Sequence, residues 1–222
     1  MRLTRLFIFC LGCSIYFSGW AADENLTLLV YGDSLSASYG IEEQQGWVNL
    51  LQIKLRSEEF PVDVINGSVS GETTTGGLAR LPAMLDSYQP KLLILELGGN
   101  DGLRGLPLNL MRENLAAMID LAKANGAEVI LTGIQIPPNY GPRYTAPFFE
   151  TYSALAEQES LALVPFLIEG IVQQPQLMQN DGIHPRAEAQ SMILDNVWPI
   201  LQDQLEILLK KERQERQERQ ER

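Results

Sequence analysis

The stretch LTLLVYGDSLS, residues 26–36, joins an apolar run to a turn built from Gly32, Asp33 and Ser34. A run that is apolar at nearly every position is typical of a strand buried on both faces of a parallel sheet. Four more runs of this kind follow, the last of them weaker: 62–66, 91–97, 128–133 and 161–164. The sequence therefore predicts a sheet of five parallel strands.

Segments with helical spacing separate these runs, because their apolar residues recur three or four positions apart. Asn125 and Gly126 give one of these segments a helix stop. Strands that alternate with helices predict an α/β layered fold, in which a ligand binds beyond the carboxyl ends of the strands. The four apolar stripes are Trp47, Leu50, Leu51 and Leu55; Leu78, Leu81 and Leu85; Leu110, Leu115, Met118, Ile119 and Ala122; and Ile193, Val197, Ile200 and Leu201.

Polar clusters follow the first three strands, and a fourth lies near the C-terminus. They are GDSLS at 32–36, GSVSGET at 67–73, GGND at 98–101 and DGIHP at 181–185. Each cluster alone fits an ordinary turn, since turns favour Gly, Asp, Asn and Ser for backbone reasons. Together they supply one serine, one histidine, one orienting carboxylate and several amide donors, which are the groups that acyl transfer through an activated hydroxyl requires.

These four blocks, in this order, resemble the GDSL, or SGNH, hydrolases. The stretch ELGGNDGLRG at 96–105 is also similar, and the resemblance spans roughly residues 26 to 205. It implies a three-layer α/β/α sandwich around a flavodoxin-like, five-stranded parallel sheet. It also implies a serine esterase and thioesterase, of the kind that acts as acyl-CoA thioesterase, lysophospholipase and arylesterase on small-molecule acyl esters and thioesters.

The resemblance assigns a role to each block. Ser34 would be the nucleophile and would carry the acyl group, His184 the general base, and Asp181 the carboxylate that orients the imidazole. The oxyanion hole would consist of the backbone N–H groups of Ser34 and Gly71 and the side-chain amide of Asn100. Neither a metal nor another cofactor is expected.

Four neighbouring features have less specific interpretations. We expect Asp33 and Asp101 to be structural, because Asp side chains beside Gly-rich turns bond nearby amides. The segment 102–107 would lie beside the site, and its glycines would allow it to move on substrate binding. The stretch 134–147, which contains four prolines, would line the acyl groove by resemblance; alternatively it is a long surface loop.

Two other functions remain open at this stage. One is a carbohydrate (acetyl) esterase of the cell envelope within the same family, and the other is a non-catalytic flavodoxin-like binding module. The module would not need Asp181, His184 or three oxyanion donors. The chain contains no G-x-S-x-G pentapeptide of the α/β-hydrolase type.

Composition excludes further classes. The 222 residues include 17 basic and 28 acidic ones, for a net charge of −11, so the chain gains nothing from counterion release at nucleic-acid phosphates. One histidine and two cysteines are too few for a typical zinc site. No helical stripe lacks a partner, so we expect a monomer.

Both ends of the chain are predicted to be appendages. Arg2 and Arg5 precede an apolar run at 6–18, and Ala21 follows, a pattern typical of a secretory signal peptide over residues 1–21. The alternative is an uncleaved anchor. Cleavage would leave 15 basic and 28 acidic residues, a net charge of −13, and a periplasmic or secreted protein with no stable membrane insertion.

The hydrolase domain is then expected over residues 22–209, followed by a charged tail over 210–222. This tail repeats Glu-Arg-Gln up to Arg222. A period of three does not match the 3.6 of a helix, so the tail is expected to fray in solvent. Its residues are nevertheless helix formers and could extend the preceding helix.

Overall fold

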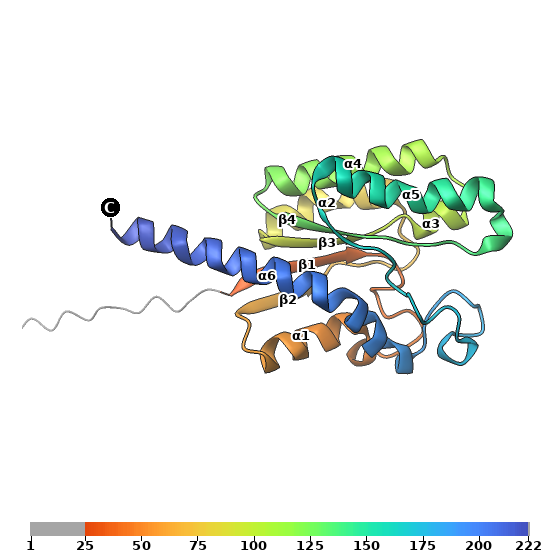
Figure 1. Cartoon of the computed structure of the whole chain (residues 1–222), viewed down its shortest axis with the longest axis horizontal. Helices are drawn as coiled ribbons and strands as arrows, with labels where there is room; N and C mark the ends of the chain where they lie inside the picture. Colours follow the sequence, from red (N-terminus) through yellow and green to blue (C-terminus); the bar gives the residue numbers. More distant parts are fainter. Residues whose placement is uncertain (1–24, 222) are drawn as a thin grey trace, which may run out of the picture.

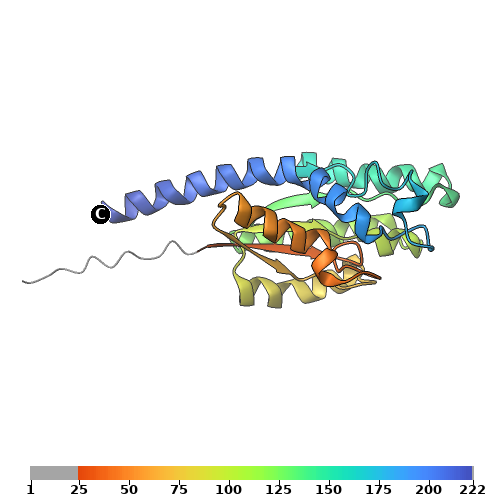
Figure 2. The same cartoon turned by 90° about the horizontal axis from the view of Figure 1, so that it is seen from below.

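The structure is a computed structural model that describes residues 25–221. Figure 1 shows a central sheet between two layers of helices, and the same three layers are seen from below in Figure 2. This confirms the expected α/β/α sandwich. The predicted signal peptide over residues 1–21, with Cys10 and Cys13, lies outside the described residues.

Five parallel strands form the sheet in the order β2-β1-β3-β4-β5. All five predicted runs are strands. Gly32 pairs in register with Glu96, so β1 and β3 end side by side and the loops that follow them are neighbours. The strand bounds are β1 Leu26–Gly32, β2 Val62–Asn66, β3 Leu92–Glu96, β4 Glu128–Thr132 and β5 Ala162–Val164.

Helices cover both faces of the sheet, and the sheet separates the hydrophobic core into two clusters. On one face α1 packs against α6, and on the other α2, α4 and α5 lie side by side (Figure 1). Four short 3₁₀ helices lie in the connections. The helices are α1 Trp47–Ser57, α2 Thr74–Tyr88, α3 Gly99–Leu103, α4 Leu108–Ala124, α5 Pro142–Glu159 and α6 Gln190–Gln220, with η1 Glu43–Gln45, η2 Pro138–Tyr140, η3 Pro175–Leu177 and η4 Ala187–Ala189.

Three local expectations were wrong. Strand β2 is not buried on both faces, because it is the edge strand of the sheet and Asp63 on it is exposed. In α4 it is Met111 that is buried, whereas Leu110 is 39% exposed. The stretch 134–147 is not one long loop, because Pro142 begins α5. Proline suits this first helical position, where its missing N–H group leaves no hydrogen bond unmade.

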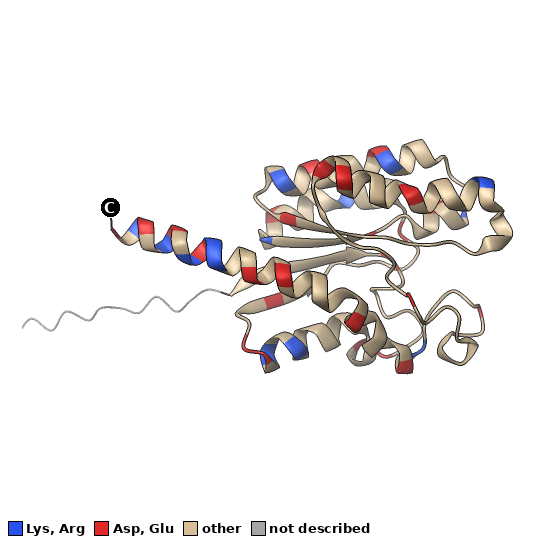
Figure 3. Cartoon of the chain, viewed as in Figure 1, with Lys and Arg blue, Asp and Glu red and all other residues tan. Residues whose placement is uncertain are grey.

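The charged repeat continues α6 instead of separating from it. The helix runs to Gln220, and its last turns extend beyond the sheet with basic and acidic residues alternating along them (Figure 3). Lys211 lies 3.7 Å from Glu128, and Glu212 lies 3.6 Å from Lys91, so two ion pairs join the start of the repeat to the amino-terminal starts of β3 and β4. No helix between residues 25 and 221 is long and apolar enough to cross a membrane.

Candidate active site

Ser34 lies in the turn after β1, at the carboxyl edge of the sheet. Its Oγ is 2.8 Å from Nε2 of His184, a residue 150 positions later in the chain. Nδ1 of the same imidazole is 2.7 Å from Oδ2 of Asp181. When the ring proton is on Nδ1, Nε2 accepts a hydrogen bond from the serine hydroxyl. The structure thus brings the three predicted residues into one hydrogen-bonded series.

A tight loop presents Asp181 and His184 together. Gly182 has a φ of +69°, which only glycine adopts easily. The second carboxylate oxygen of Asp181, Oδ1, accepts hydrogen bonds from the N–H groups of Ile183 and His184. Burial alone would raise the pKa of Asp181, but its hydrogen bonds with the imidazole and with these two N–H groups lower it to about 2. Asp181 is therefore a carboxylate at any pH at which the protein works.

Tyr39 packs against the imidazole from the loop that follows Ser34, and sequence reasoning missed it. The ring centroids of Tyr39 and His184 are 4.4 Å apart. The side-chain amide of Gln179 donates to the carbonyl groups of Tyr39 and Pro185, which ties this loop to the histidine loop. No spacing in the sequence links Tyr39 with a residue so far along the chain.

Asn100 lies at the start of α3, immediately after β3. Its Nδ2 donates to Oδ2 of Asp33 at 3.0 Å. A side-chain amide has two N–H bonds, so the second remains available to a ligand. Asp33 is therefore more than a turn residue, because it directly orients the candidate oxyanion donor.

Asp33 forms a buried acidic pair with Glu96. Asp33 is 3% exposed and Glu96 is fully buried. Burial raises the pKa of Asp33 to about 6, although hydrogen bonds from the Leu35 N–H and from Asn100 lower it. Burial, and then the nearby Asp33 charge, raise the pKa of Glu96 well above its usual value. Glu96 therefore holds its proton more readily than an ordinary glutamate, and at neutral pH Asp33 is the charged acceptor.

Glu96 is a second residue that sequence reasoning did not assign to the site. Its Oε2 accepts hydrogen bonds from Ser36 Oγ at 2.7 Å and from the Asp33 N–H at 3.2 Å. It thereby fixes the turn that carries Ser34. The signal that could have found it is an acidic residue that ends the otherwise apolar run LLILE.

The backbone N–H groups of Ser34 and Gly71 have no acceptor within residues 25–221. Gly71 has a φ of +80° and lies in the loop between β2 and α2. Its carbonyl accepts a hydrogen bond of 2.9 Å from Arg104, which caps α3. Two free N–H groups and the second Asn100 N–H bond are the donor set that an oxyanion needs.

An apolar cavity of about 300 Å³ adjoins Ser34 and Asn100. Its other walls include Leu103, Ile134, Ile136 and Phe166. The part of the stretch 134–147 that lines the cavity is its first five residues. Its two tyrosines, at 140 and 144, instead donate to the carbonyls of Leu103 and Leu106.

Those two hydrogen bonds tether the segment 102–107, which the sequence suggested could move. Gly102 in this segment is buried, and a Cβ there would overlap Phe148 and Ile136. Close packing therefore accounts for this glycine.

Asp101, also buried, accepts hydrogen bonds from the Thr74 N–H at 2.8 Å and from Thr74 Oγ1 at 2.6 Å, joining α3 to α2. Between residues 25 and 221, no three His, Cys, Asp or Glu side chains are grouped to hold a metal ion.

The chain is similar in sequence to known proteins. Residues 30–191 match the family described as the GDSL-like Lipase/Acylhydrolase family. The chain is 54% identical over 176 residues to "Esterase TesA" of Pseudomonas aeruginosa, covering 79% of this chain and 88% of that one. It is 44% identical to "Thioesterase 1/protease 1/lysophospholipase L1" of Escherichia coli strain K12, covering 81% of this chain and 83% of that one.

Among solved structures, the chain is similar to the psychrotrophic esterase EstA from Pseudoalteromonas, which was crystallised inhibited by monoethylphosphonate. The TM-score is 0.79 at 42% sequence identity, and the match covers 82% of this chain and all of the other. The likeness thus extends over most of the chain.

Proposed function

This chain belongs to the GDSL-like lipase/acylhydrolase family and is an acyl-ester hydrolase, and we propose that Ser34, His184 and Asp181 are its catalytic triad. The observation that carries the proposal is the unbroken series from Ser34 Oγ through His184 to Asp181, with contacts of 2.8 and 2.7 Å. The enzymatic activity of the family removes the non-catalytic binding module from consideration.

In the proposed reaction Ser34 Oγ attacks the acyl carbonyl carbon, and its proton passes to Nε2 of His184. Asp181 stabilises the imidazolium that forms. The carbonyl oxygen becomes an oxyanion and accepts hydrogen bonds from the N–H groups of Ser34 and Gly71 and from Asn100 Nδ2. The alcohol or thiol leaves with the proton from His184. Water then attacks the acyl carbonyl carbon while the same imidazole removes its proton, and the imidazolium returns that proton to Ser34 Oγ as the carboxylic acid leaves.

Thioesters and lysophospholipids are the finer part of the proposal. Two features support them: the relatives' names include both activities, and the cavity beside Ser34 is apolar and large enough to accept part of an acyl chain. A panel of p-nitrophenyl esters of increasing chain length, an acyl-CoA and a lysophospholipid tests this range. Turnover confined to acetylated carbohydrates would favour the envelope carbohydrate esterase instead.

The test of the triad is Ser34→Ala. The variant is expected to keep its circular-dichroism spectrum and melting temperature while losing ester turnover and labelling by a fluorophosphonate probe, because the acyl group then has no acceptor atom. Turnover close to that of the wild type in the folded variant would contradict the proposal.

We further propose that residues 1–21 are a signal peptide, that residues 22–209 are the hydrolase domain followed by the 210–222 tail, and that the enzyme acts as a periplasmic or secreted monomer. The basic residues Arg2 and Arg5 before an apolar run support export. The mass of the intact protein from a periplasmic fraction tests cleavage, and light scattering tests the oligomeric state. A full-length mass in that fraction would contradict cleavage.

A further inference from the structure

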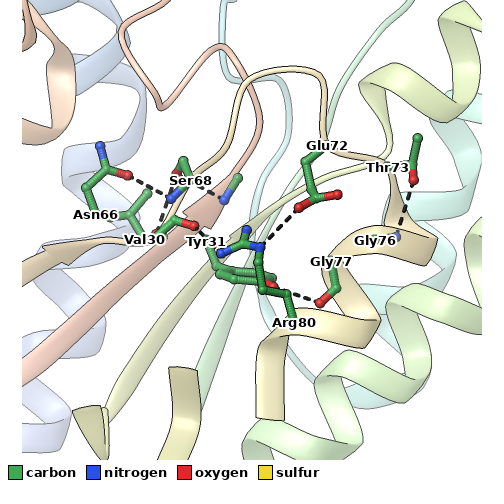
Figure 4. A network of polar contacts seen from close by, with 11 residues as sticks. Val30, Tyr31, Asn66, Ser68, Glu72, Thr73, Gly76, Gly77 and Arg80 are labelled. Carbon is green, nitrogen blue, oxygen red and sulfur yellow. Dashed lines mark hydrogen bonds and ion pairs between the residues drawn. The ribbon is translucent and has the colours of Figure 1, made fainter. Parts of the chain in front are cut away.

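The loop 67–73 carries Gly71, and its first part continues the hydrogen bonding of the sheet. Gly67 N–H donates to the Val30 carbonyl at 2.8 Å, and Val69 N–H donates to the Gly32 carbonyl at 3.0 Å. Ser68 Oγ accepts from the Gly32 N–H at 3.1 Å (Figure 4). The loop therefore starts from a fixed position beside the strand that leads to Ser34.

Arg80, on the second turn of α2, holds both ends of this loop. Its Nη1 donates to the Gly67 carbonyl at 2.9 Å, and its Nε donates to Oε2 of Glu72 at 3.1 Å (Figure 4). Glu72 directly follows Gly71. One rigid, planar guanidinium thus joins the first residue of the loop to the residue beside the candidate oxyanion donor.

The surroundings of Arg80 keep the guanidinium in this place. It lies over the ring of Tyr31, 4.6 Å from the ring centroid, and Tyr31 itself donates to the Gly77 carbonyl of α2. The Arg80 and Glu72 side chains are 30% and 14% exposed. A charge-assisted contact that is largely shielded from solvent is stronger than a surface ion pair.

Gly71 needs this support from neighbouring residues, because the backbone of glycine has more conformational freedom than that of any other residue. Within the loop, the Glu72 N–H donates to the Val69 carbonyl, and on the outer side Arg104 contacts the Gly71 carbonyl. Neither contact connects the two ends of the loop. Arg80 makes that connection from the inner side.

We propose that Arg80 is a positioning residue for catalysis: by holding Gly67 and Glu72 it fixes the Gly71 N–H where the oxyanion forms. This inference rests on the proposed function, in which Gly71 is an oxyanion donor. An oxyanion contact is made mainly in the transition state, so a misplaced donor lowers kcat more than it raises KM.

The test compares Arg80→Gln and Arg80→Lys with Lys123→Gln as the control. Lys123 also makes an ion pair and a carbonyl contact, with Glu159, but between α4 and α5. Turnover of a chromogenic ester is divided by the concentration of active sites, titrated to completion with a fluorophosphonate. Inhibition by an alkylboronic acid, which forms a tetrahedral adduct on serine, is measured in parallel.

Arg80→Gln is expected to lower kcat per active site at least tenfold, to change KM less than twofold, and to weaken boronate binding by a factor similar to the loss in kcat/KM. Arg80→Lys is expected to fall between Arg80→Gln and the wild type, because an ammonium can pair with Glu72 but does not reproduce the planar two-point contact. Lys123→Gln is expected to keep the wild-type values. If Arg80→Gln does not fold, Arg80→Lys alone decides on the same criteria, with at least a threefold loss of kcat expected.

An unchanged kcat per active site in the folded Arg80 variants would overturn the inference. So would a loss that appears only in the fraction of titrated sites, since this is what a purely structural role produces. Failure here is distinct from failure of the proposed function: if Ser34→Ala abolishes turnover while the Arg80 variants turn over normally, only the role of Arg80 is wrong.

Discussion

Asp33 is expected to make the free energy of unfolding depend on pH. Burial is the main reason that its pKa is about 6 in the folded protein, against an ordinary value of 3.8. A group whose pKa is raised by folding stabilises the folded state when protonated, and this contribution is lost as pH rises through the folded-state pKa. At about 1.4 kcal/mol per pKa unit, the full loss is roughly 3 kcal/mol, of which about 2 kcal/mol falls between pH 4.5 and 7.5.

The perturbation that isolates this effect is Asp33→Asn, because asparagine does not titrate. Urea unfolding of the wild type and the variant between pH 4.5 and 7.5 gives the difference in their free energies of unfolding. The part of this difference that stays the same at every pH reports hydrogen bonds altered by the substitution. The part that changes with pH reports the Asp33 carboxyl group together with its effect on the neighbouring Glu96, and it is expected to shift by about 2 kcal/mol in favour of the variant as pH rises.

Asp203→Asn is the matched control, because Asp203 is exposed on α6 and no buried carboxyl is removed. Its difference from the wild type is expected to stay within about 0.5 kcal/mol over the same range. If the Asp33→Asn difference is just as flat, Asp33 takes up protons equally in both states. The account of a buried charge oriented toward Asn100 would then be wrong.

Three further predictions concern the same edge of the sheet. Asn100→Ala is expected to lower kcat roughly 100-fold or more with a smaller change in KM, measured on a chromogenic ester, because one oxyanion donor is lost; an unchanged kcat would contradict that role. In the wild type, kcat/KM is expected to fall as pH drops through about 6, because Asp33 is then protonated and no longer a charged acceptor for Asn100. Asp33→Asn is expected to lose less of its kcat/KM over this range, and equal losses in both proteins would show that the ionisation of Asp33 does not matter to turnover. Gly98→Ala is expected to lower the free energy of unfolding, measured with urea, by at least about 2 kcal/mol, because Gly98 has a φ of +117° and a Cβ would overlap the Tyr152 hydroxyl. The control is Gly126→Ala, where φ is also positive but the space around the Cβ is open. It is expected to lower the free energy of unfolding by about 1 kcal/mol.

The strands could be predicted because burial on both faces leaves a direct signal, an apolar run. Helix α5 escaped prediction because Pro142 and Pro147 look like loop residues. A proline at the first helical position removes no hydrogen bond, and the packing of Phe148 and Tyr152 holds the rest of the helix in place despite Pro147. Tertiary packing thus stabilises a helix whose local sequence is typical of a loop.

The candidate site shows a similar division. Motif order sufficed to name Ser34, Asn100 and His184, because each lies in a short polar block that follows an apolar run or forms a tight loop. The contact between Asn100 and Asp33 joins residues 67 positions apart and depends on β1 pairing with β3. Which residues of neighbouring loops meet is a property of strand order and register, and a single sequence does not state either directly.

The order of the elements along the chain, with α6 after all five strands, has a consequence for shortened forms of the protein. The part of α6 up to Leu208 packs on the face of the sheet on which α1 lies, and the proposed base His184 precedes the helix by only a few positions. A chain shortened to end before His184 therefore has an uncovered apolar face and no imidazole beside Ser34. Contacts between such distant parts of a chain form late and slowly. A fragment that ends before residue 184 is consequently expected to show no ester turnover, however much of the sheet it contains.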